Sequence, residues 1–152
     1  MIIQNRRAKF KFNLKEKLEV GLSLHGNEIK GIRSGKVSLE ESFVRVTRGE
    51  AYLVGAYIAP YQAEKGDPKR DRKLLLHKKE INALLGKVSR LGLTIIPTKV
   101  YTKAGKIKVE IALASSKKVA DKRAFLKEKD VKREIERTLR EEKLKFQKES
   151  RV

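Results

Sequence analysis

The chain has 152 residues, which suffices for one globular domain with extensions and is too short for two independent domains. It contains no cysteine, so disulfides, thiolate nucleophiles and cysteine-based metal sites are excluded. Its 38 Lys and Arg residues against 19 Asp and Glu give a net charge of +19. A charge of this size favours a polyanionic partner, above all nucleic acid.

We expect a cytoplasmic protein with no membrane partner. No apolar run approaches the roughly 20 residues needed to span a bilayer. The first segment, "MIIQNRRAKFKF", places its basic residues after a very short apolar start, which is the reverse of a secretory signal.

The first part of the chain predicts β-strands around a short helix. Residues 9–24 alternate between apolar and polar side chains in two pieces separated by residues 15–17, which predicts a strand pair. Residues 25–35, "HGNEIKGIRSG", contain two isoleucines three residues apart and suit one or two helical turns. Residues 43–54 alternate on both sides of "TRGE", which indicates a hairpin whose turn uses Gly49.

A loop and a helix are predicted next. Residues 62–72, "QAEKGDPKRDR", are polar and aperiodic, so we expect an exposed loop. An apolar stripe with helical spacing begins at Leu74 and Leu75, and it predicts a helix over residues 77–91 that ends at Gly92.

Residues 94–116 complete the first domain. Two β-branched alternating runs surround "KAGK", which predicts a second hairpin with its turn at Gly105. Several antiparallel strands with one long helix predict a mainly β fold with flanking helices, either a small β-barrel or a rolled sheet. We therefore expect one domain over residues 1–116, which carries +13 of the net charge, and a separate tail over residues 117–152, which carries +6.

The tail is capable of forming a helix but is poor in apolar surface. It contains no proline or glycine, and Val131, Ile135 and Leu139 form a row with a spacing of four residues. Acid-before-base pairs at i,i+4 each contribute only a few tenths of a kcal/mol, which does not offset the entropy cost of ordering the segment. We expect the tail to be disordered alone. These pairs are Glu128/Lys132, Glu136/Arg140 and Glu141/Lys145.

The chain lacks the motifs of an enzyme. Its two histidines, His25 and His77, lie in different predicted elements, and there is no nucleophile elbow or GxxxxGK phosphate loop. No ligand spacing for a metal is present. We expect a protein without catalytic activity, metal or cofactor. His77 has two open interpretations, namely capping the helix that follows it or touching RNA.

Glu28 stands out among basic residues directly after a glycine turn. Its carboxylate suits either capping of a backbone amide at the start of the short helix or hydrogen bonding to nucleobase edges, and the pattern leaves both open. With only five Phe and four Tyr, the chain favours a folded RNA over a stacked single strand. Basic residues gather in four bursts, which are Arg6-Arg7-Lys9-Lys11, Lys30-Arg33-Lys36, Lys69 to Lys79, and Lys99-Lys103-Lys106-Lys108.

Residues 26–46, "GNEIKGIRSGKVSLEESFVRV", closely resemble the G-x-E-x-K-x-x-R-x-G-x-x-x-L-x-x-S-[FY]-[VA] signature of the SsrA-binding protein (SmpB) family. Further blocks follow in family order, up to the middle of the tail. These blocks are "NRRAKFKF", "YIAPY", "RKLLLHKKEI", "GLTIIPTKVYTKAGKIKVEIALASSKK" and "DKR".

The resemblance implies a fold and a function. The fold is a small closed barrel of the oligonucleotide-binding (OB) type with flanking helices. The function is that of a non-enzymatic adaptor, which binds the tRNA-like domain of transfer-messenger RNA (tmRNA, or SsrA) and brings it to stalled ribosomes for trans-translation. The implied partners are tmRNA, elongation factor Tu and the ribosome, chiefly its small-subunit RNA.

The resemblance also implies functional residues. In the tail, Ala120 departs from the histidine or tyrosine of many relatives, which removes a stacking side chain, and residues 138–152 inherit little. Gly35 is expected to shape the loop with Gly26. The RNA-facing set comprises Asn5, Arg6, Arg7, Gly26, Glu28, Lys30, Arg33, Lys36, Lys73, His77 and Lys78, and the decoding-site set comprises Lys117, Lys118, Asp121, Lys122 and Arg123.

A competing hypothesis explains the positive charge by binding to nucleic acids in general, without one dedicated RNA. In it, the chain is a generic oligonucleotide-binding or ribosome-associated protein. Equal affinity for tmRNA, bulk tRNA and arbitrary duplex distinguishes this hypothesis from the first.

Overall fold

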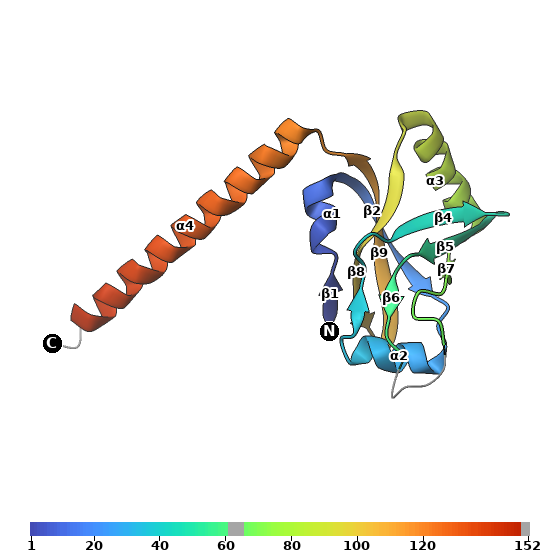
Figure 1. Cartoon of the computed structure of the whole chain (residues 1–152), viewed down its shortest axis with the longest axis horizontal. Coiled ribbons are helices and arrows are strands. Elements are labelled where there is room, and N and C mark those ends of the chain that lie inside the picture. Colours follow the sequence, from blue (N-terminus) through green and yellow to red (C-terminus); the bar gives the residue numbers. More distant parts are fainter. Residues whose placement is uncertain (61–65, 150–152) are drawn as a thin grey trace. The chain divides into compact units, whose positions relative to one another are not determined.

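The computed structural model describes residues 1–60 and 66–149, apart from the side chains of residues 119–121, 125 and 146–149. The chain divides into two compact units, Met1–Ser116 and Lys117–Val152. The first unit contains all the β-strands (Figure 1). Its elements in chain order are β1 (Ile2–Gln4), α1 (Arg6–Lys11), β2 (Phe12–Leu22), α2 (Gly26–Arg33), β3 (Val37–Ser38), β4 (Phe43–Thr47), β5 (Glu50–Val54), β6 (Tyr57–Ile58), β7 (Arg72–Leu75), α3 (Lys78–Leu91), β8 (Thr94–Lys103) and β9 (Lys106–Ser116).

The strands form two antiparallel sheets. The larger sheet has the order β1-β8-β9-β2-β7-β5-β4, and β3 pairs with β6 in the smaller one. The prediction of a mainly β antiparallel fold with flanking helices is confirmed, but the prediction of a closed barrel is wrong. Within the described residues no strand pair joins β1 to β4, because the three-residue β1 pairs only with β8, so the sheet stays open.

A main apolar core holds the first unit together, and a smaller cluster of Ala8, Ile96 and Ala114 lies beside α1. Strand residues such as Val109 and Ile111 are almost fully buried in the main core, at 0% and 1% exposure. Ile32 of α2 and Ile81 of α3 reach the same core, which fixes both helices on the sheet. The short helix, both hairpins and α3 were predicted correctly, and Gly92 ends α3 with a left-handed backbone (φ 63°) whose N–H donates to the Val88 carbonyl.

The prediction of a strand pair over residues 9–24 is wrong. The helix α1 takes the first part of this segment, and the side chain of Asn5 caps it by accepting a hydrogen bond from the backbone N–H of Ala8 (3.3 Å). The rest is one strand, β2, whose pairing with β9 shifts register between Leu14 and Lys17. The break in alternation is therefore an irregularity of the β-bulge kind within a strand, and it is not a turn.

The segment before α3 also differs from the expectation. Residues 66–71 form a loop, whereas residues 62–65 of the predicted loop lie outside the described residues. Arg72 begins β7 and is fully buried. Leu74 and Leu75, which were counted with the helical stripe, also belong to β7 because this strand pairs with β2 and β5.

The second unit contains one helix, α4 (Val119–Glu149). Its described side chains are largely exposed. Among these described side chains, none of the three predicted acid–base pairs lies within 4.0 Å, so these pairs add no ion-pair stability to the helix. No described helix is both long enough and apolar enough to cross a membrane.

Because the first unit has its own core, a chain ended after Ser116 should keep its stability. We expect its melting temperature, followed by circular dichroism, to lie within about 2 °C of that of the full chain. A chain ended after Ala112 is the control, since it also loses Leu113 and Ala114, which are 2% and 1% exposed. It should lose about 3 kcal/mol or more of stability. A large loss in the longer truncation would contradict the independence of the two units.

Candidate nucleic-acid interface

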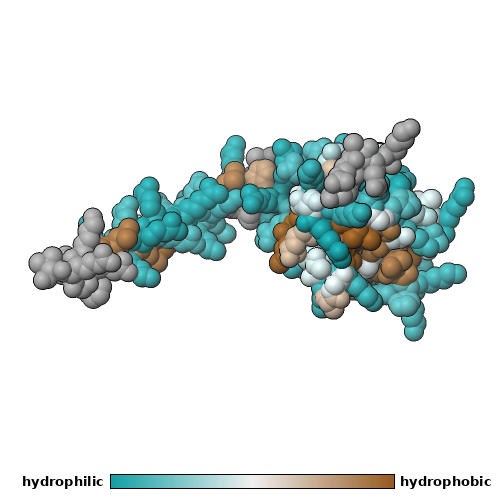
Figure 2. All heavy atoms as spheres, turned by 90° about the horizontal axis from the view of Figure 1, so that it is seen from below, coloured by the Kyte–Doolittle hydropathy of each residue, from teal (hydrophilic) through white to brown (hydrophobic). Residues whose placement is uncertain are grey.

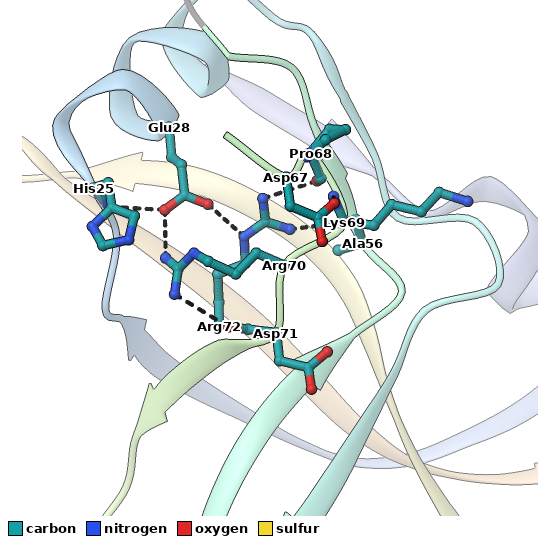
Figure 3. Close-up of polar contacts among 9 residues, drawn as sticks. All are labelled: His25, Glu28, Ala56, Asp67, Pro68, Lys69, Arg70, Asp71 and Arg72. Carbon is teal, nitrogen blue, oxygen red and sulfur yellow. Dashed lines mark hydrogen bonds and ion pairs between the residues drawn. The ribbon is translucent and has the colours of Figure 1, made fainter. Parts of the chain in front are cut away.

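A buried carboxylate anchors the start of α2 (Figure 3). Glu28 is 5% exposed, and its side chain points into the protein. Its Oε1 accepts hydrogen bonds from the backbone N–H of His25 (2.9 Å) and from Nη2 of Arg70 (2.5 Å), and its Oε2 accepts one from Nε of Arg72 (2.6 Å). Of the two interpretations of Glu28, capping of a backbone amide is therefore what the structure shows, together with two ion pairs.

Arg72 of β7 connects Glu28 to other segments of the chain through hydrogen bonds. Its side chain has 0% exposure, and each of its guanidinium nitrogens donates a hydrogen bond. Besides the bond to Glu28, Nη1 donates to the Ala56 carbonyl (2.6 Å) and Nη2 to the Pro68 carbonyl (2.9 Å). The planar fork of arginine thus joins α2, the segment after β5, the loop and β7 at one point.

The charge of Glu28 is held in place by its donors. Burial by itself raises the pKa of this carboxyl, but the His25 N–H, Arg70 and Arg72 outweigh burial and lower the pKa below its ordinary value of 4.5. Glu28 is therefore an anion at neutral pH. With its oxygens engaged inside the protein, it acts on α2 as a positioning residue.

The anchored helix presents its cations to solvent. Lys30 and Arg33 of α2 are exposed, and so is Lys36, which follows the helix. Arg33 lines a groove of about 370 Å³ together with Lys106 and Lys108, which come from the β8–β9 hairpin. The view in Figure 2 shows apolar surface bordered by hydrophilic side chains on the first unit. The apolar lining of the groove comprises Leu22, Leu24, Ile29, Leu75 and Ile107.

This groove combines two of the basic bursts in the sequence. The Lys30 to Lys36 burst was assigned to RNA, but the hairpin lysines were not. Only the clustering of lysines in "KAGKIK" could have indicated an RNA-binding role for this hairpin, since nothing in the sequence places the hairpin beside α2. A groove lined by both cations and apolar side chains suits phosphate contacts at the cations and contacts with sugars or bases at the apolar side chains.

The N-terminal block lies elsewhere. Figure 1 shows α1 and α2 apart, beside different ends of the strands. Asn5 is 6% exposed, and its Nδ2 donates to the carbonyls of Pro97 (2.9 Å) and Leu39 (3.2 Å), so its side chain holds the fold. Arg7 forms exposed ion pairs with Glu40 (3.6 Å) and Glu41 (3.5 Å). Arg6 is exposed.

The remaining predicted RNA residues are spread over three elements, α2, β7 and the start of α3. Gly26 is the exposed first residue of α2. Lys73 lies on β7 and pairs with Glu50 of β5 (3.0 Å). His77 is the N-cap of α3, where its backbone N–H donates to Glu80 (3.2 Å), and Lys78 follows it as an exposed residue. The structure therefore does not unite the predicted RNA-facing residues in one cluster.

The predicted decoding-site residues lie at the start of the tail. Lys117 and Lys118 precede α4, and Lys122 and Arg123 lie in its first turns. The backbone N–H of Lys122 donates to the Lys118 carbonyl (3.0 Å). The side chains of Asp121 and Ala120 lie outside the described residues. Among the side chains that the structure describes, no group of three or more His, Asp or Glu residues has the arrangement of a metal site.

Fold and surface define a class of small, strongly basic β-sheet proteins with a separate charged helix. The family model described as "SmpB protein" matches residues 2–141. The chain therefore belongs to the SmpB family.

Curated relatives named "SsrA-binding protein" agree with this. The one from Persephonella marina is 51% identical over 89% of this chain and 91% of its own length. The one from Aquifex aeolicus is 53% identical over 90% of this chain and 89% of its own length. A chain of the solved structure reported as "tmRNA-SmpB: a journey to the center of the bacterial ribosome" is similar with a TM-score of 0.67 and 44% identity, over 80% of this chain and 92% of that chain.

Replacing Glu28 by Gln should destabilise the first unit strongly, because it leaves the buried guanidinium of Arg72 without an anion. We expect a loss of about 3–5 kcal/mol at neutral pH, measured by urea unfolding. Glu80→Gln is the matched control, since Glu80 makes the same backbone contact at the start of α3 with no buried arginine. It should cost less than about 1 kcal/mol.

The same variant has a defined pH dependence. The folded-state pKa of Glu28 is lowered, so its contribution is complete above the ordinary value of 4.5 and is lost as the pH falls through the lower folded value. The stability difference between the wild type and Glu28→Gln should therefore shrink only below about pH 4.5. A difference that is constant down to acid unfolding would contradict an ionised Glu28.

Proposed function

We propose that this chain is a non-enzymatic RNA-binding adaptor for trans-translation. It binds the tRNA-like domain of tmRNA and delivers it to stalled ribosomes, with the C-terminal tail in the decoding site and the empty message channel. Family membership over residues 2–141 carries this proposal. The strongly basic first unit, with its groove beside α2, supplies the physical means.

We propose that tmRNA is held chiefly at the groove. Lys30 and Arg33 of α2 supply phosphate contacts together with Lys36, which follows the helix. The hairpin residues Lys106 and Lys108 line the groove with Arg33 and extend this surface. Glu28 supports this surface from within the fold, whereas Asn5 supports the N-terminal block at α1, since both are buried and engaged in internal hydrogen bonds. We propose peripheral contacts by residues that lie on other elements or are already paired, namely Arg6, Arg7, Lys73, His77 and Lys78. Gly26 is proposed as a contact at the exposed start of α2.

The tail has a separate role in the proposal. As a segment with little apolar surface it is disordered alone and becomes helical on the ribosome, where phosphate contacts offset the entropy cost of ordering. Lys117, Lys118, Asp121, Lys122 and Arg123 would meet the decoding site. We also propose that elongation factor Tu joins the delivery complex and that the protein acts in the cytoplasm, where its ribosomal partner lies.

Removing the positive charges on α2 and just after it should weaken tmRNA binding specifically. In a Lys30, Arg33 and Lys36→Gln triple variant, three lost phosphate contacts should reduce the slope of log K against log salt by about 2–3. Its stability should be unchanged, because the three side chains are exposed. Filter binding to the isolated tRNA-like domain at several salt concentrations measures the slope.

The control for this variant removes the same charge from the tail. Lys127, Lys129 and Arg133→Gln should leave binding to the isolated tRNA-like domain unchanged. If both triple variants weakened tmRNA, bulk tRNA and duplex RNA equally, the competing hypothesis of a generic RNA-binding protein would hold instead.

The division of labour predicts a separation of activities. A chain ended after Ser116 should bind tmRNA within about threefold of the full-length affinity, because the groove and its anchor remain intact. It should lose tagging of nascent chains on stalled ribosomes in a reconstituted assay. Loss of RNA binding in this truncation, or retention of tagging, would contradict the proposed role of the tail.

A further inference from the structure

A carboxylate bridges two cations of the N-terminal block. The helix α1, "RRAKFK", contains basic residues and no acid. A single oxygen of Glu41, Oε1, lies 3.5 Å from Nη1 of Arg7 and 3.4 Å from Nζ of Lys11. Glu40 adds a second acid, whose Oε2 lies 3.6 Å from Nε of Arg7. A phosphate oxygen bound by an arginine and a lysine would take the same place as Oε1 of Glu41.

The turn that carries Glu41 is fixed to α1 by buried hydrogen bonds. Glu41 has a left-handed backbone (φ 61°), which is sterically unfavourable for a residue with a Cβ atom. The carbonyl of Leu39 accepts hydrogen bonds from the hydroxyl of Ser42 (2.5 Å), the backbone N–H of Ser42 (3.2 Å) and Nδ2 of Asn5 (3.2 Å). Because Asn5 also caps α1, the fold holds this unfavourable turn beside the cations of the helix.

A cavity lies next to the bridged cations. Its volume of about 340 Å³ falls within the range of roughly 300–1,000 Å³ that is typical of ligand sites. Arg7, Lys11 and Glu41 line it together with the rings of Phe12 and Phe43. Phe43 is 40% exposed, so its ring is accessible from solvent. The cavity therefore combines cations with aromatic surface and has room for one nucleotide, but not for an RNA helix.

The ion pairs of Glu41 are weak enough to be replaced. The side chains of Glu41, Arg7 and Lys11 are 68%, 54% and 41% exposed, and exposed ion pairs are screened by water and salt. A phosphate of RNA acts together with its neighbours along the strand, and its binding releases counterions. Such a phosphate has an advantage over a single carboxylate in competing for the two cations.

We propose that the cavity beside α1 binds an unpaired nucleotide of small-subunit ribosomal RNA and that Glu41 closes this site in the free protein. A phosphate replaces the Glu41 carboxylate between Arg7 and Lys11, and the base lies against the ring of Phe43. Free RNA is thereby kept from the N-terminal cations, because it has to displace an anion that is already in place.

The position of the cavity favours small-subunit RNA over tmRNA. This step rests on the proposed function, which brings the tail into the decoding site. Ser116, the last residue of the first unit, lines the cavity and pairs with Phe12. Because the tail begins at the next residue, a tail in the decoding site keeps the cavity close to the RNA of the small subunit. The groove proposed for tmRNA lies beside α2, which is apart from α1 (Figure 1).

Glu41→Gln tests whether the carboxylate closes the site. We expect the full chain to bind isolated small ribosomal subunits three- to tenfold more tightly, to within about a factor of two, because RNA no longer has to displace an anion. The slope of log K against log salt should become steeper by about one, since no freed carboxylate takes up a cation. Binding to the isolated tRNA-like domain of tmRNA should change by less than about twofold. Filter binding at several salt concentrations measures all three quantities.

Glu16→Gln is the matched control for this variant. Glu16 also forms an exposed ion pair, with Lys87, but it lies outside the lining of the cavity. The control should change each affinity by less than about twofold. If Glu16→Gln tightened binding to small subunits as much as Glu41→Gln does, the effect would be one of net charge and the inference would be overturned.

A double-mutant cycle tests whether Glu41 acts through the two cations. Arg7→Gln with Lys11→Gln should weaken binding to small subunits by about tenfold or more, and adding Glu41→Gln should then cause no tightening. Tightening that persists without the two cations would overturn the closed site. Tightening of tmRNA binding in place of small-subunit binding would overturn the assignment to ribosomal RNA.

Phe43→Ala tests the contact with the base. Loss of the ring should weaken binding to small subunits by about fivefold or more. Leu85→Ala on α3 is the control, since Leu85 is also 40% exposed, and it should leave binding unchanged. An unchanged affinity of Phe43→Ala would overturn the inference alone. Failure of the unaltered chain to bind small subunits would overturn the proposed function as well.

Discussion

The buried ion pair between Glu28 and Arg72 is the constraint on which the candidate interface depends. Two charges removed from water are tolerated only when their remaining hydrogen-bonding groups are satisfied, and here each guanidinium nitrogen has an acceptor. Those three acceptors belong to three different segments of the chain, none of which is the strand that holds Arg72. The pair therefore does more than offset its desolvation, because it fixes the orientation of α2 on the sheet. The cations on α2 are thereby held on one rigid surface.

The interface shows how a protein with a net charge of +19 keeps a folded core. Apolar strand residues make up the core, while acids near the surface neutralise several cations locally, as Glu50 does for Lys73 and Glu41 does for Arg7. These exposed pairs add little stability. Their consequence is to reduce the cationic character of β7 and α1, so that the groove beside α2 remains the strongest candidate for binding a polyanion.

Local sequence patterns predicted most of the helices and strands, but not the contacts between segments that are distant in sequence. Periodicity and turn residues were sufficient for α2, α3 and both hairpins, since each depends on neighbours in sequence. The break at Lys15 and Glu16 was misread as a turn, because a bulge and a turn interrupt alternation alike. Arg72 was placed in an exposed loop because its partner, Glu28, is 44 residues away. Closure of a sheet likewise depends on pairing between distant strands, which no local pattern records.

The tail carries acids as well as cations, in contrast to the more basic first unit. A segment meant only to bind RNA would gain from replacing its acids, since each carboxylate weakens attraction to phosphate. The tail nevertheless keeps eight acids beside its fourteen cations, and both kinds of charge occur around the whole helix. Its low net charge of +6 also limits competition with the first unit for free tmRNA. In the proposed function, these acids weaken the attraction of the tail to phosphate in general, so that the tail orders only where many phosphate contacts are available at once.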